Sequence, residues 1–463
     1  MIDDHDTIVA PATASGGALA VIRVSGEEAL KICDRIFRGR VPLADTPGNT
    51  FRYGRIVEND RIIDDVVASV FRAPHSYTGE DSVELSCHGS SYIVGEILRL
   101  LIAAGARMAE PGEFTIRAYL GGKLDLAQAE AVADLIASSS RAAHAMASTQ
   151  MRGGFSEELE TLRDRLLQLT SLLELELDFS EEDVEFADRR ELCTTMQRIG
   201  EEIERLRRSF ALGNAIKEGV AVAIVGAPNV GKSTLLNRLL NEERAMVSEI
   251  AGTTRDVIEE SIDLGGVRFR FLDTAGIRAT DDRLERMGIE RTLESLRRAR
   301  IILYMADAQQ LAAGLSHPDL TKALGEKFGE AFTPGPDQRI LTVINKTDRL
   351  PEGYSLPEGA IGISAKLGEG IGALCEALRA AVDTEALYHG EAVVSNSRHY
   401  EALTAAGEAL RRARQGLDEG LPADLLSEEI REVIRHLGSI TGRGVIAPDE
   451  VLGNIFSKFC IGK

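Results

Sequence analysis

Residues 226–233 read Gly-Ala-Pro-Asn-Val-Gly-Lys-Ser and follow an apolar run at 220–225. The segment fits the pattern G-x-x-x-x-G-K-[ST], in which glycines let backbone N–H groups turn inward around phosphate oxygens. The next seven residues, Thr-Leu-Leu-Asn-Arg-Leu-Leu, predict a helix whose N-terminus adds positive partial charge. We therefore predict a strand, a phosphate loop and a helix, with Lys232 on the β and γ phosphates and Ser233 on Mg²⁺.

Short apolar runs alternate with helical segments after this loop, which predicts a parallel sheet with crossover helices. The expected strands are 220–225, 268–272, 301–305, 340–344 and 360–363. The flanking sequence differs, because its apolar residues recur three and four positions apart, which is typical of a helical bundle. These residues are Leu159, Leu162, Leu166, Leu169 and Leu173, then Met196, Ile199, Ile203, Leu206 and Phe210, and finally Leu426, Ile430, Val433 and Leu437. The α/β unit is therefore expected to be an insertion in a helical region.

The first part of the chain shows a third, mixed pattern. It predicts strands at 17–24 and 66–71 and a helix at 25–38 with Ser25 as its N-cap. We predict a multidomain protein with four segments along the chain. They are an α+β N-terminal domain at 1–118, an all-α helical domain at 119–215 and 384–463, and an inserted Ras-like α/β P-loop GTPase domain at 216–383.

Composition limits the classes of function. The formal net charge of −20 argues against a protein that grips a nucleic acid unaided, because such proteins usually carry a basic surface. A partner is expected to supply much of the contact with any RNA. The apolar runs are short and no signal core is seen at the N-terminus, so we expect a cytoplasmic protein. The five cysteines form no CxxC pair, which suggests neither a zinc site nor a disulfide framework.

Three further motifs identify the nucleotide. Asp273-Thr-Ala-Gly276 follows an expected strand and offers a carboxylate to the Mg²⁺ shell and an N–H to the γ-phosphate. Asn345-Lys-Thr-Asp348 follows another, and Asp348 provides two acceptor oxygens for the two donors on the edge of guanine. Ser364-Ala-Lys366 can close over the base. The four motifs in this order predict GTP rather than ATP, because adenine lacks that pair of donors.

The stretch Gly252-Thr-Thr-Arg-Asp256 lies between the first two motifs, where Thr254 can complete the Mg²⁺ shell when the γ-phosphate is present. A departure follows at Ile277, because Ras-like proteins use a glutamine there to orient the attacking water. An isoleucine cannot do this, so another group must position the water. The following loop offers Asp281, Asp282 and Glu285, and Arg283 or Arg286. Glu285 is our choice of catalytic residue. That choice depends chiefly on the family resemblance described below.

Asn229 in the phosphate loop suggests a source of transition-state charge other than an arginine finger. Its side-chain oxygen could bind a monovalent cation together with backbone carbonyls of the 248–253 loop. The alternative is that Asn229 only hydrogen-bonds its own loop. The sequence leaves both open.

The whole chain resembles the MnmE (TrmE) family of tRNA-modification GTPases. The segments that carry the resemblance, besides the GTPase motifs, are Ala20-Val-Ile-Arg-Val-Ser-Gly26, Tyr77-Thr-Gly-Glu-Asp81, Pro111-Gly-Glu-Phe-Thr-x-Arg117, Lys123-Leu-Asp-Leu-Ala-Gln-Ala-Glu-Ala131 and Cys460-Ile-Gly-Lys463. The resemblance implies a homodimer with a folate-binding, dimerising N-terminal domain. It also implies a heterotetramer with the FAD-dependent MnmG. This complex uses a tetrahydrofolate one-carbon unit to modify carbon 5 of the wobble uridine of certain tRNAs, to which it adds an aminomethyl-type group.

The resemblance also assigns residues. It implies that Arg23, Glu80, Lys123 and Lys463 bind 5-formyl- or 5,10-methylene-tetrahydrofolate, and that Asn229, Ser248, Ile250 and Thr253 bind K⁺, with Ser248 where some members have threonine. Ser233 and Thr254 match the Mg²⁺ ligands, and Glu285 matches the catalytic acid. The complete GTP-binding set that we predict is Asn229, Val230, Gly231, Lys232, Ser233, Thr234, Ser248, Glu249, Ile250, Ala251, Gly252, Thr253, Thr254, Asp273, Thr274, Ala275, Gly276, Asn345, Lys346, Asp348, Ser364, Ala365 and Lys366.

Two other functions are compatible with the GTPase motifs. One is a ribosome-assembly GTPase that acts as an RNA-binding switch, although such proteins typically add a basic domain that this acidic chain lacks. The other is a helical scaffold with a regulatory GTPase. Cys460 superficially fits a prenylation box, but the Gly and Lys after it are poor at those positions, and the resemblance places it in a tail near the folate site. A catalytic role for its thiol is a separate alternative, which the sequence does not support.

Overall fold

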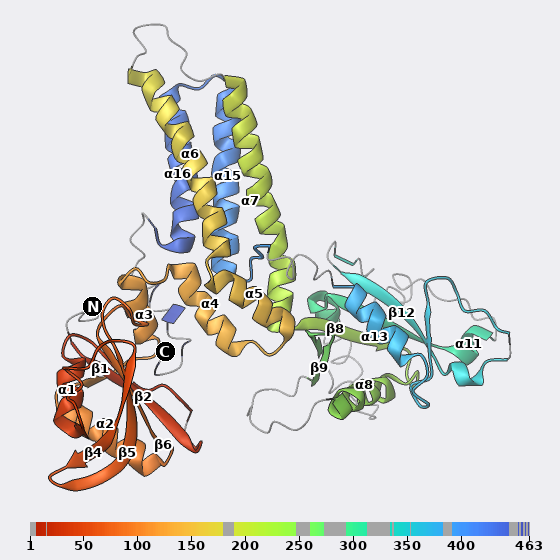
Figure 1. Cartoon of the computed structure of the whole chain (residues 1–463). Coiled ribbons are helices and arrows are strands. Elements are labelled where there is room, and N and C mark those ends of the chain that lie inside the picture. Colours follow the sequence, from red (N-terminus) through yellow and green to blue (C-terminus); the bar gives the residue numbers. More distant parts are fainter. Residues whose placement is uncertain are drawn as a thin grey trace. The chain divides into compact units, whose positions relative to one another are not determined.

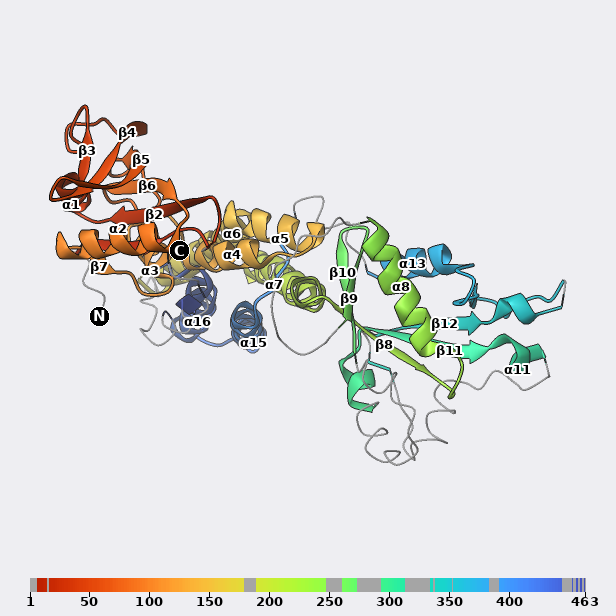
Figure 2. The ribbon, with the colours of Figure 1, turned by 90° about the horizontal axis from the view of Figure 1, so that it is seen from below.

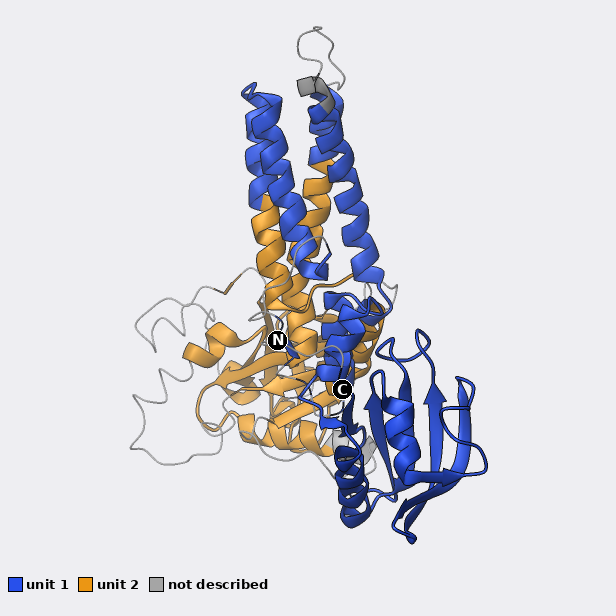
Figure 3. Cartoon of the chain, turned by 90° about the vertical axis from the view of Figure 1, so that its left-hand side faces the viewer, with its two compact units in different colours: residues 1–136, 150–196, 408–463 blue, residues 137–149, 197–407 orange. Residues whose placement is uncertain are grey.

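The computed structural model describes residues 6–14, 16–178, 189–246, 260–272, 293–312, 334–335, 338–351, 353–382 and 391–443, together with 452, 455–456, 459 and 462 in the tail. The side chains of 175–178 and 242–246 are outside this description. The chain forms two compact units, which are coloured separately in Figure 3. Unit 1 contains residues 1–136, 150–196 and 408–463, and unit 2 contains 137–149 and 197–407.

Unit 1 begins with a seven-stranded sheet of order β3-β4-β5-β6-β2-β1-β7, shown in red and orange in Figure 1. Neighbouring strands are antiparallel except β1 and β7. The strands are β1 Ile8–Pro11, β2 Leu19–Ser25, β3 Phe37–Gly39, β4 Thr50–Glu58, β5 Arg61–Phe71, β6 Ser82–His88 and β7 Arg107–Met108. Helices α1 (Ala29–Ile36) and α2 (Ser91–Ala103) bury their apolar side chains in the same core as the strands. Alternate residues of β5 enter this core, as the period of a strand requires.

The next two helices, α3 (Glu113–Leu120) and α4 (Leu126–Ala137), share a small apolar cluster with the tail of the chain. Phe456 and Phe459 are buried against Ile116 and Leu126 in this cluster. Gly112 makes the approach possible, because a Cβ there would lie 2.8 Å from the Phe456 carbonyl oxygen and its φ of +74° favours glycine. The C-terminal residues therefore complete the packing of α3 and α4.

Two long helices of unit 1, α6 (Gly154–Asp178) and α16 (Ala423–Thr441), pack against each other although they are far apart in the sequence (Figure 2). Their buried residues include all those expected from the periodic pattern, which are Leu159, Leu162, Leu166, Leu169 and Leu173 on α6 and Leu426, Ile430, Val433 and Leu437 on α16. The predicted helical region on both sides of the insertion is confirmed.

Unit 2 is built on a six-stranded sheet of order β13-β12-β11-β8-β10-β9. Its strands are β8 Val220–Gly226, β9 Glu260–Leu264, β10 Val267–Phe271, β11 Ile301–Asp307, β12 Arg339–Asn345 and β13 Ile361–Ile363. All are parallel except β9, which pairs antiparallel with β10 at the edge. Its helices include α5 (Arg141–Met151), α8 (Lys232–Met246), α11 (Ala308–Ala312) and α13 (Ile371–Ala380), with the later part of α7 (Arg189–Glu218) and the first part of α15 (Ser397–Asp418). The predicted α/β fold of the insertion is confirmed.

The structure corrects three expectations, two about the helix at 25–38 and one about the parallel sheet. Ser25 does not cap a helix: it ends β2, and α1 begins four residues later, after Glu28 at the N-cap position. The residues at the end of the expected helix, from Phe37, form the short strand β3 instead. The edge strand β9 was not expected, so the sheet is mixed rather than wholly parallel.

Candidate functional site

The phosphate loop connects β8 to α8 at the carboxyl end of the parallel strands, as the sequence predicts. The Lys232 ammonium donates to the carbonyl oxygens of Gly226 and Ala227, at 3.0 and 2.9 Å, so the side chain curls over the loop. Ser233 and Thr234 follow in the first turn of α8, where backbone N–H groups are available to an anion. The loop therefore has the arrangement needed to hold a phosphate chain.

Asn345 ties the phosphate loop to the segments expected at the base. Its side chain is 3% exposed, donates through Nδ2 to the Val230 carbonyl oxygen at 2.7 Å, and accepts from the Ala365 N–H at 3.0 Å through Oδ1. Gly231 is required at this contact, because a Cβ there would lie 2.2 Å from Asn345 Nδ2 and its φ is +104°. One buried amide thus fixes three loops against one another.

Two ion-pairing groups lie beside this amide. Lys346 donates to the Asn229 carbonyl oxygen at 2.9 Å and to Asp307 Oδ2 at 2.6 Å. Burial raises the pKa of Asp307, but hydrogen bonds from Lys346 and the Gln309 N–H offset this effect and hold the pKa below its ordinary value. Asp307 is a member of the site that the sequence analysis missed. Its position directly after the buried strand β11 was the available signal.

Asp348 is exposed, and Ser364 donates to its Oδ1 at 2.7 Å. This bond orients the carboxylate and leaves Oδ2 for a second donor. Ser364 is fully buried, whereas Lys366, two residues on, is exposed. The structure therefore brings the three described motifs together at one edge of the sheet.

The Asn229 side chain has no hydrogen-bond partner among the described residues, while its backbone carbonyl accepts from Lys346. Its φ of +61° is left-handed, a conformation that asparagine tolerates better than most residues. The bond to its own loop that the sequence left open is therefore not made in this structure.

The remaining residues predicted at the nucleotide lie outside the described residues. They are Ser248, Glu249, Ile250, Ala251, Gly252, Thr253, Thr254, Asp273, Thr274, Ala275, Gly276 and Glu285. Cys460 and Lys463 of the tail also lie outside them.

A second group of predicted residues converges on the 72–81 loop of the N-terminal domain. Arg23 on β2 stands opposite Glu84 on β6, and its Nε and Nη2 bind Glu84 Oε1 at 2.9 and 2.8 Å. The Arg23 guanidinium lies over the rings of Tyr77 and Phe114, 5.1 and 5.6 Å from their centroids. Lys123 reaches the same loop and donates to the Pro74 carbonyl oxygen at 3.0 Å.

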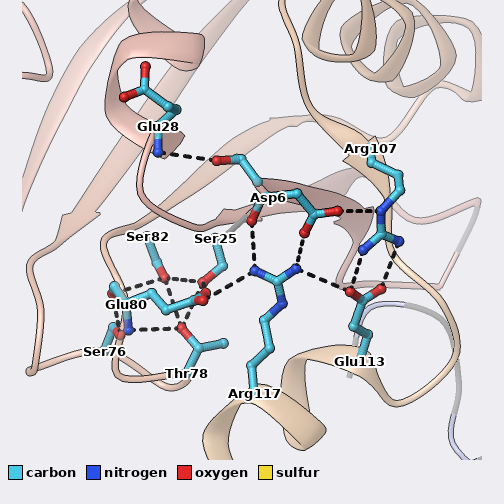
Figure 4. Close-up of polar contacts among 11 residues, drawn as sticks. Asp6, Ser25, Glu28, Ser76, Thr78, Glu80, Ser82, Arg107, Glu113 and Arg117 are labelled. Carbon is cyan, nitrogen blue, oxygen red and sulfur yellow. Dashed lines mark hydrogen bonds and ion pairs between the residues drawn. The ribbon is translucent and has the colours of Figure 1, made fainter. Parts of the chain in front are cut away.

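Glu80 of this loop has both carboxylate oxygens engaged (Figure 4). Ser25, two residues after Arg23 on β2, donates to Oε2 at 2.7 Å, and Arg117 donates to Oε1 at 3.2 Å. Ser25 also contacts the hydroxyls of Thr78 and Ser82, at 2.7 and 2.9 Å. The carboxylate is therefore oriented from two sides.

Arg117 is the centre of an ionic cluster in which it and Glu113 are buried, whereas Asp6 and Arg107 are partly exposed (Figure 4). It binds the Asp6 carbonyl oxygen at 2.8 Å, an Asp6 carboxylate oxygen, and Glu113 Oε1 at 3.2 Å. Arg107 holds the same Glu113 carboxylate in two bonds, at 2.6 and 3.1 Å. Burial raises the pKa of Glu113, but bonds from Arg107, the Glu110 N–H and Arg117 keep the pKa below its ordinary value. The sequence analysis assigned no role to this cluster.

Two protein-family models match the chain. The model described as "GTP-binding protein TrmE N-terminus" covers residues 7–123, and the model described as "MnmE helical domain" covers residues 126–460. A "tRNA modification GTPase MnmE" of Christiangramia forsetii is 51% identical over 476 aligned residues, which cover 99% of both chains. The chain belongs to the MnmE family of tRNA modification GTPases.

This MnmE-family chain is also 51% identical to the protein of the same name from Bacteroides fragilis, over 99% of its own length and 100% of the relative. Membership makes it a GTPase, in agreement with the motifs. A crystal structure of an Aquifex aeolicus Era variant bound to GDP and AlF4⁻ is 28% identical and covers 41% of this chain and 65% of that one, with a TM-score of 0.26. The assignment to MnmE therefore depends on the full-length relatives. No described helix combines the length and apolarity needed to cross a bilayer.

Proposed function

We propose that this chain hydrolyses GTP as one step in the modification of carbon 5 of the wobble uridine of certain tRNAs. The product carries an aminomethyl-type group, and the carbon comes from 5-formyl- or 5,10-methylene-tetrahydrofolate. A homodimer of this chain acts with an FAD-dependent partner of the MnmG type as a heterotetramer in the cytoplasm. The proposed domains are 1–118 for folate and dimerisation, 119–215 and 384–463 for the helical frame, and 216–383 for GTP.

The observation that carries the folate part is the convergence of Arg23, Glu80 and Lys123 on one loop. Arginine and lysine suit the carboxylates of a folate tail, and an oriented carboxylate suits the N–H donors of a pterin. Gly462 lies against this domain, since a Cβ there would be 2.0 Å from the Pro11 carbonyl oxygen. This contact supports the proposal that the neighbouring Lys463 and Cys460 serve the same site.

The GTP part has separate support. The oriented Asp348 carboxylate favours guanine, and Ser233 with Thr254 would hold Mg²⁺. The Asn229 side chain, with no partner among the described residues, supports a K⁺ site shared with Ser248, Ile250 and Thr253. Bound K⁺ would supply positive charge beside the phosphates, and we propose Glu285 as the group that orients water. The GTPase domains of a dimer would meet when GTP and K⁺ bind.

The test is nucleoside analysis of wobble uridines in cells that lack the gene and are complemented with defined variants. We expect Arg23→Ala to fail to restore the modification and to lose binding of labelled 5-formyltetrahydrofolate. Arg38→Ala is the matched control, because Arg38 is exposed in the same domain and donates only to nearby carbonyl oxygens. Unchanged wobble uridines in cells without the gene, together with accumulated ribosomal precursors, would favour the ribosome-assembly alternative instead.

A further inference from the structure

A cleft of about 550 Å³ lies within unit 2, away from the nucleotide site. It is bounded by the end of α7, by Ala221 near the start of β8, by Arg270 of β10 and by Arg300, which directly precedes β11. Ala221 and Arg300 are at the amino ends of β8 and β11, and Arg270 is level with them because it pairs with Ala221, whereas the phosphate loop follows the carboxyl end of β8. The cleft is therefore separate from the GTP site.

Positive charge is concentrated in this cleft. Its lining contains four arginines, at 270, 297, 298 and 300, and one acidic residue, Glu218. The whole chain carries a formal charge of −20, so a group with this balance is unusual for the molecule. Arg300 is anchored, because it donates to the Ala211 carbonyl oxygen at 3.0 Å.

Two of these arginines lack a neutralising partner in the described part of the chain, a property they share with some exposed arginines elsewhere, such as Arg198 and Arg411. Arg297 and Arg298 are exposed and make no ion pair or hydrogen bond with any described residue. By contrast, Arg99 binds Glu58 and Glu96, Arg412 binds Glu429, and Arg431 binds Glu174. Glu218, the one carboxylate in the described lining of the cleft, makes no ion pair with either arginine, so their charge is not neutralised within the described residues.

Arg297 and Arg298 are at the end of a helical segment, 293–298, but stabilisation of that segment does not account for them. Arginines are often found at the end of a helix, where they complement exposed carbonyl oxygens. Here the Gln338 side-chain amide already donates to the carbonyl oxygens of Leu296 and Ala299, at 2.7 and 2.6 Å. The guanidinium groups of Arg297 and Arg298 therefore remain available to an outside anion.

We propose that this cleft binds the sugar-phosphate backbone of the RNA substrate, with Arg297 and Arg298 as phosphate ligands. The inference rests on the proposed function, which makes RNA the substrate. Guanidinium groups form paired hydrogen bonds with phosphate oxygens, and a cleft of this size exceeds what one phosphate needs. A chain with so large a negative charge can approach a polyanion only where positive charge is gathered locally.

The experiment uses the full-length chain and an unmodified tRNA transcript with uridine at the wobble position. Affinity is measured from 50 to 200 mM NaCl for the native chain and for Arg297→Gln/Arg298→Gln. The matched control is Arg431→Gln/Arg435→Gln, which removes the same charge from exposed arginines that are paired with Glu174 and Glu432. Thermal unfolding and GTP hydrolysis confirm that both variants are folded.

Loss of two phosphate contacts should lower the slope of log affinity against log salt by about 1.4 to 1.8 and weaken binding about tenfold or more at 50 mM. The control should keep the native slope. Equal effects of both double variants, no effect of either, or no salt-dependent binding by the native chain would each overturn the assignment. If millimolar pyrophosphate binds the native chain but not Arg297→Gln/Arg298→Gln, while both bind tRNA equally, the cleft is a small-anion site and the assignment also fails.

The same variants separate this inference from the proposed function. Cells that carry Arg297→Gln/Arg298→Gln should show reduced modification of wobble uridines, and the control should restore it. Reduced modification with unchanged tRNA affinity would assign the cleft to an acidic surface of a protein partner. Normal modification with unchanged tRNA affinity would refute the assignment of the cleft to RNA binding, but it would not affect the proposed function.

Discussion

Replacing Arg117 by methionine should destabilise the N-terminal domain, because it keeps an unbranched apolar stem but removes the guanidinium group. The side chain of Arg117 is 2% exposed and binds three carboxylates and one carbonyl oxygen. Hydrogen bonds to charged groups contribute about 1.5–3 kcal/mol each when their partners are buried. Asp6 and Glu80 are partly exposed and can regain water, and Glu113 keeps both bonds to Arg107. We therefore expect the free energy of unfolding of the N-terminal domain to fall by about 3 kcal/mol, near the lower end of the range for breaking a buried ion pair.

Amide hydrogen exchange in α3 is the appropriate assay, because the chain has several domains and a single unfolding transition is not assured. A loss of about 3 kcal/mol corresponds to exchange roughly a hundredfold faster. The control is Arg99→Met, since Arg99 also binds two glutamates but is 49% exposed, and its loss should change exchange in α2 by less than about fivefold. Equal effects of the two variants, or slower exchange after Arg117→Met, would refute the electrostatic account.

The pH dependence of stability provides a second test of how much the ionic cluster around Arg117 stabilises the domain. Burial raises the pKa of Asp6 and of Glu113, and the arginine bonds more than offset this, so both pKa values lie below their ordinary range. A carboxyl whose pKa is depressed on folding stabilises the native state above its unfolded pKa of about 4, and this contribution is lost as the pH falls through the folded pKa. The difference between the native chain and Arg117→Met should therefore be full at neutral pH and shrink below about pH 4. A difference that grows on acidification would contradict the assignment.

Three further predictions concern the GTP site. Asp348→Asn should weaken GTP binding about 5- to 150-fold and favour xanthosine triphosphate, which offers an acceptor where guanine has a donor; equal affinities before and after the change would exclude Asp348 from the base. Replacing K⁺ by Na⁺ should sharply slow turnover by the native chain but not by Asn229→Ala, and equal native rates in the two salts would remove the cation proposal. Glu285→Ala should slow turnover with little change in GTP affinity, whereas loss of binding would indicate a structural role.

Periodic features of the sequence predicted the fold well, because burial imposes them locally. The leucine spacing of α6 and the apolar run of β8 each report one buried face or strand. Ser25 was misassigned because its hydroxyl is suited equally to a helix cap and to a polar contact. Its actual partners, Thr78, Glu80 and Ser82, are more than 50 positions away and leave no local signal.

The candidate site was predictable to the extent that short motifs determine it. The phosphate and base motifs place Lys232 and Asp348 by position alone, but they do not reveal that the Asn345 amide joins the loops. Glu113 and Arg117 stand four positions apart, which suggests an ordinary surface pair on a helix. Their burial depends on Asp6, 111 positions from Arg117, and such distant contacts are fixed only by the folded chain.

The burial of Phe456 and Phe459 against α3 and α4 has a consequence for how the protein is made. Ile116 leaves the ribosome about 340 residues before Phe456, and at 5–20 residues per second this interval is about 20 to 70 s. During that time α3 and α4 expose the apolar surface that the tail will cover. This early part of the chain is therefore completed last, and premature termination anywhere in the inserted GTPase would leave that apolar surface exposed to chaperones and proteases.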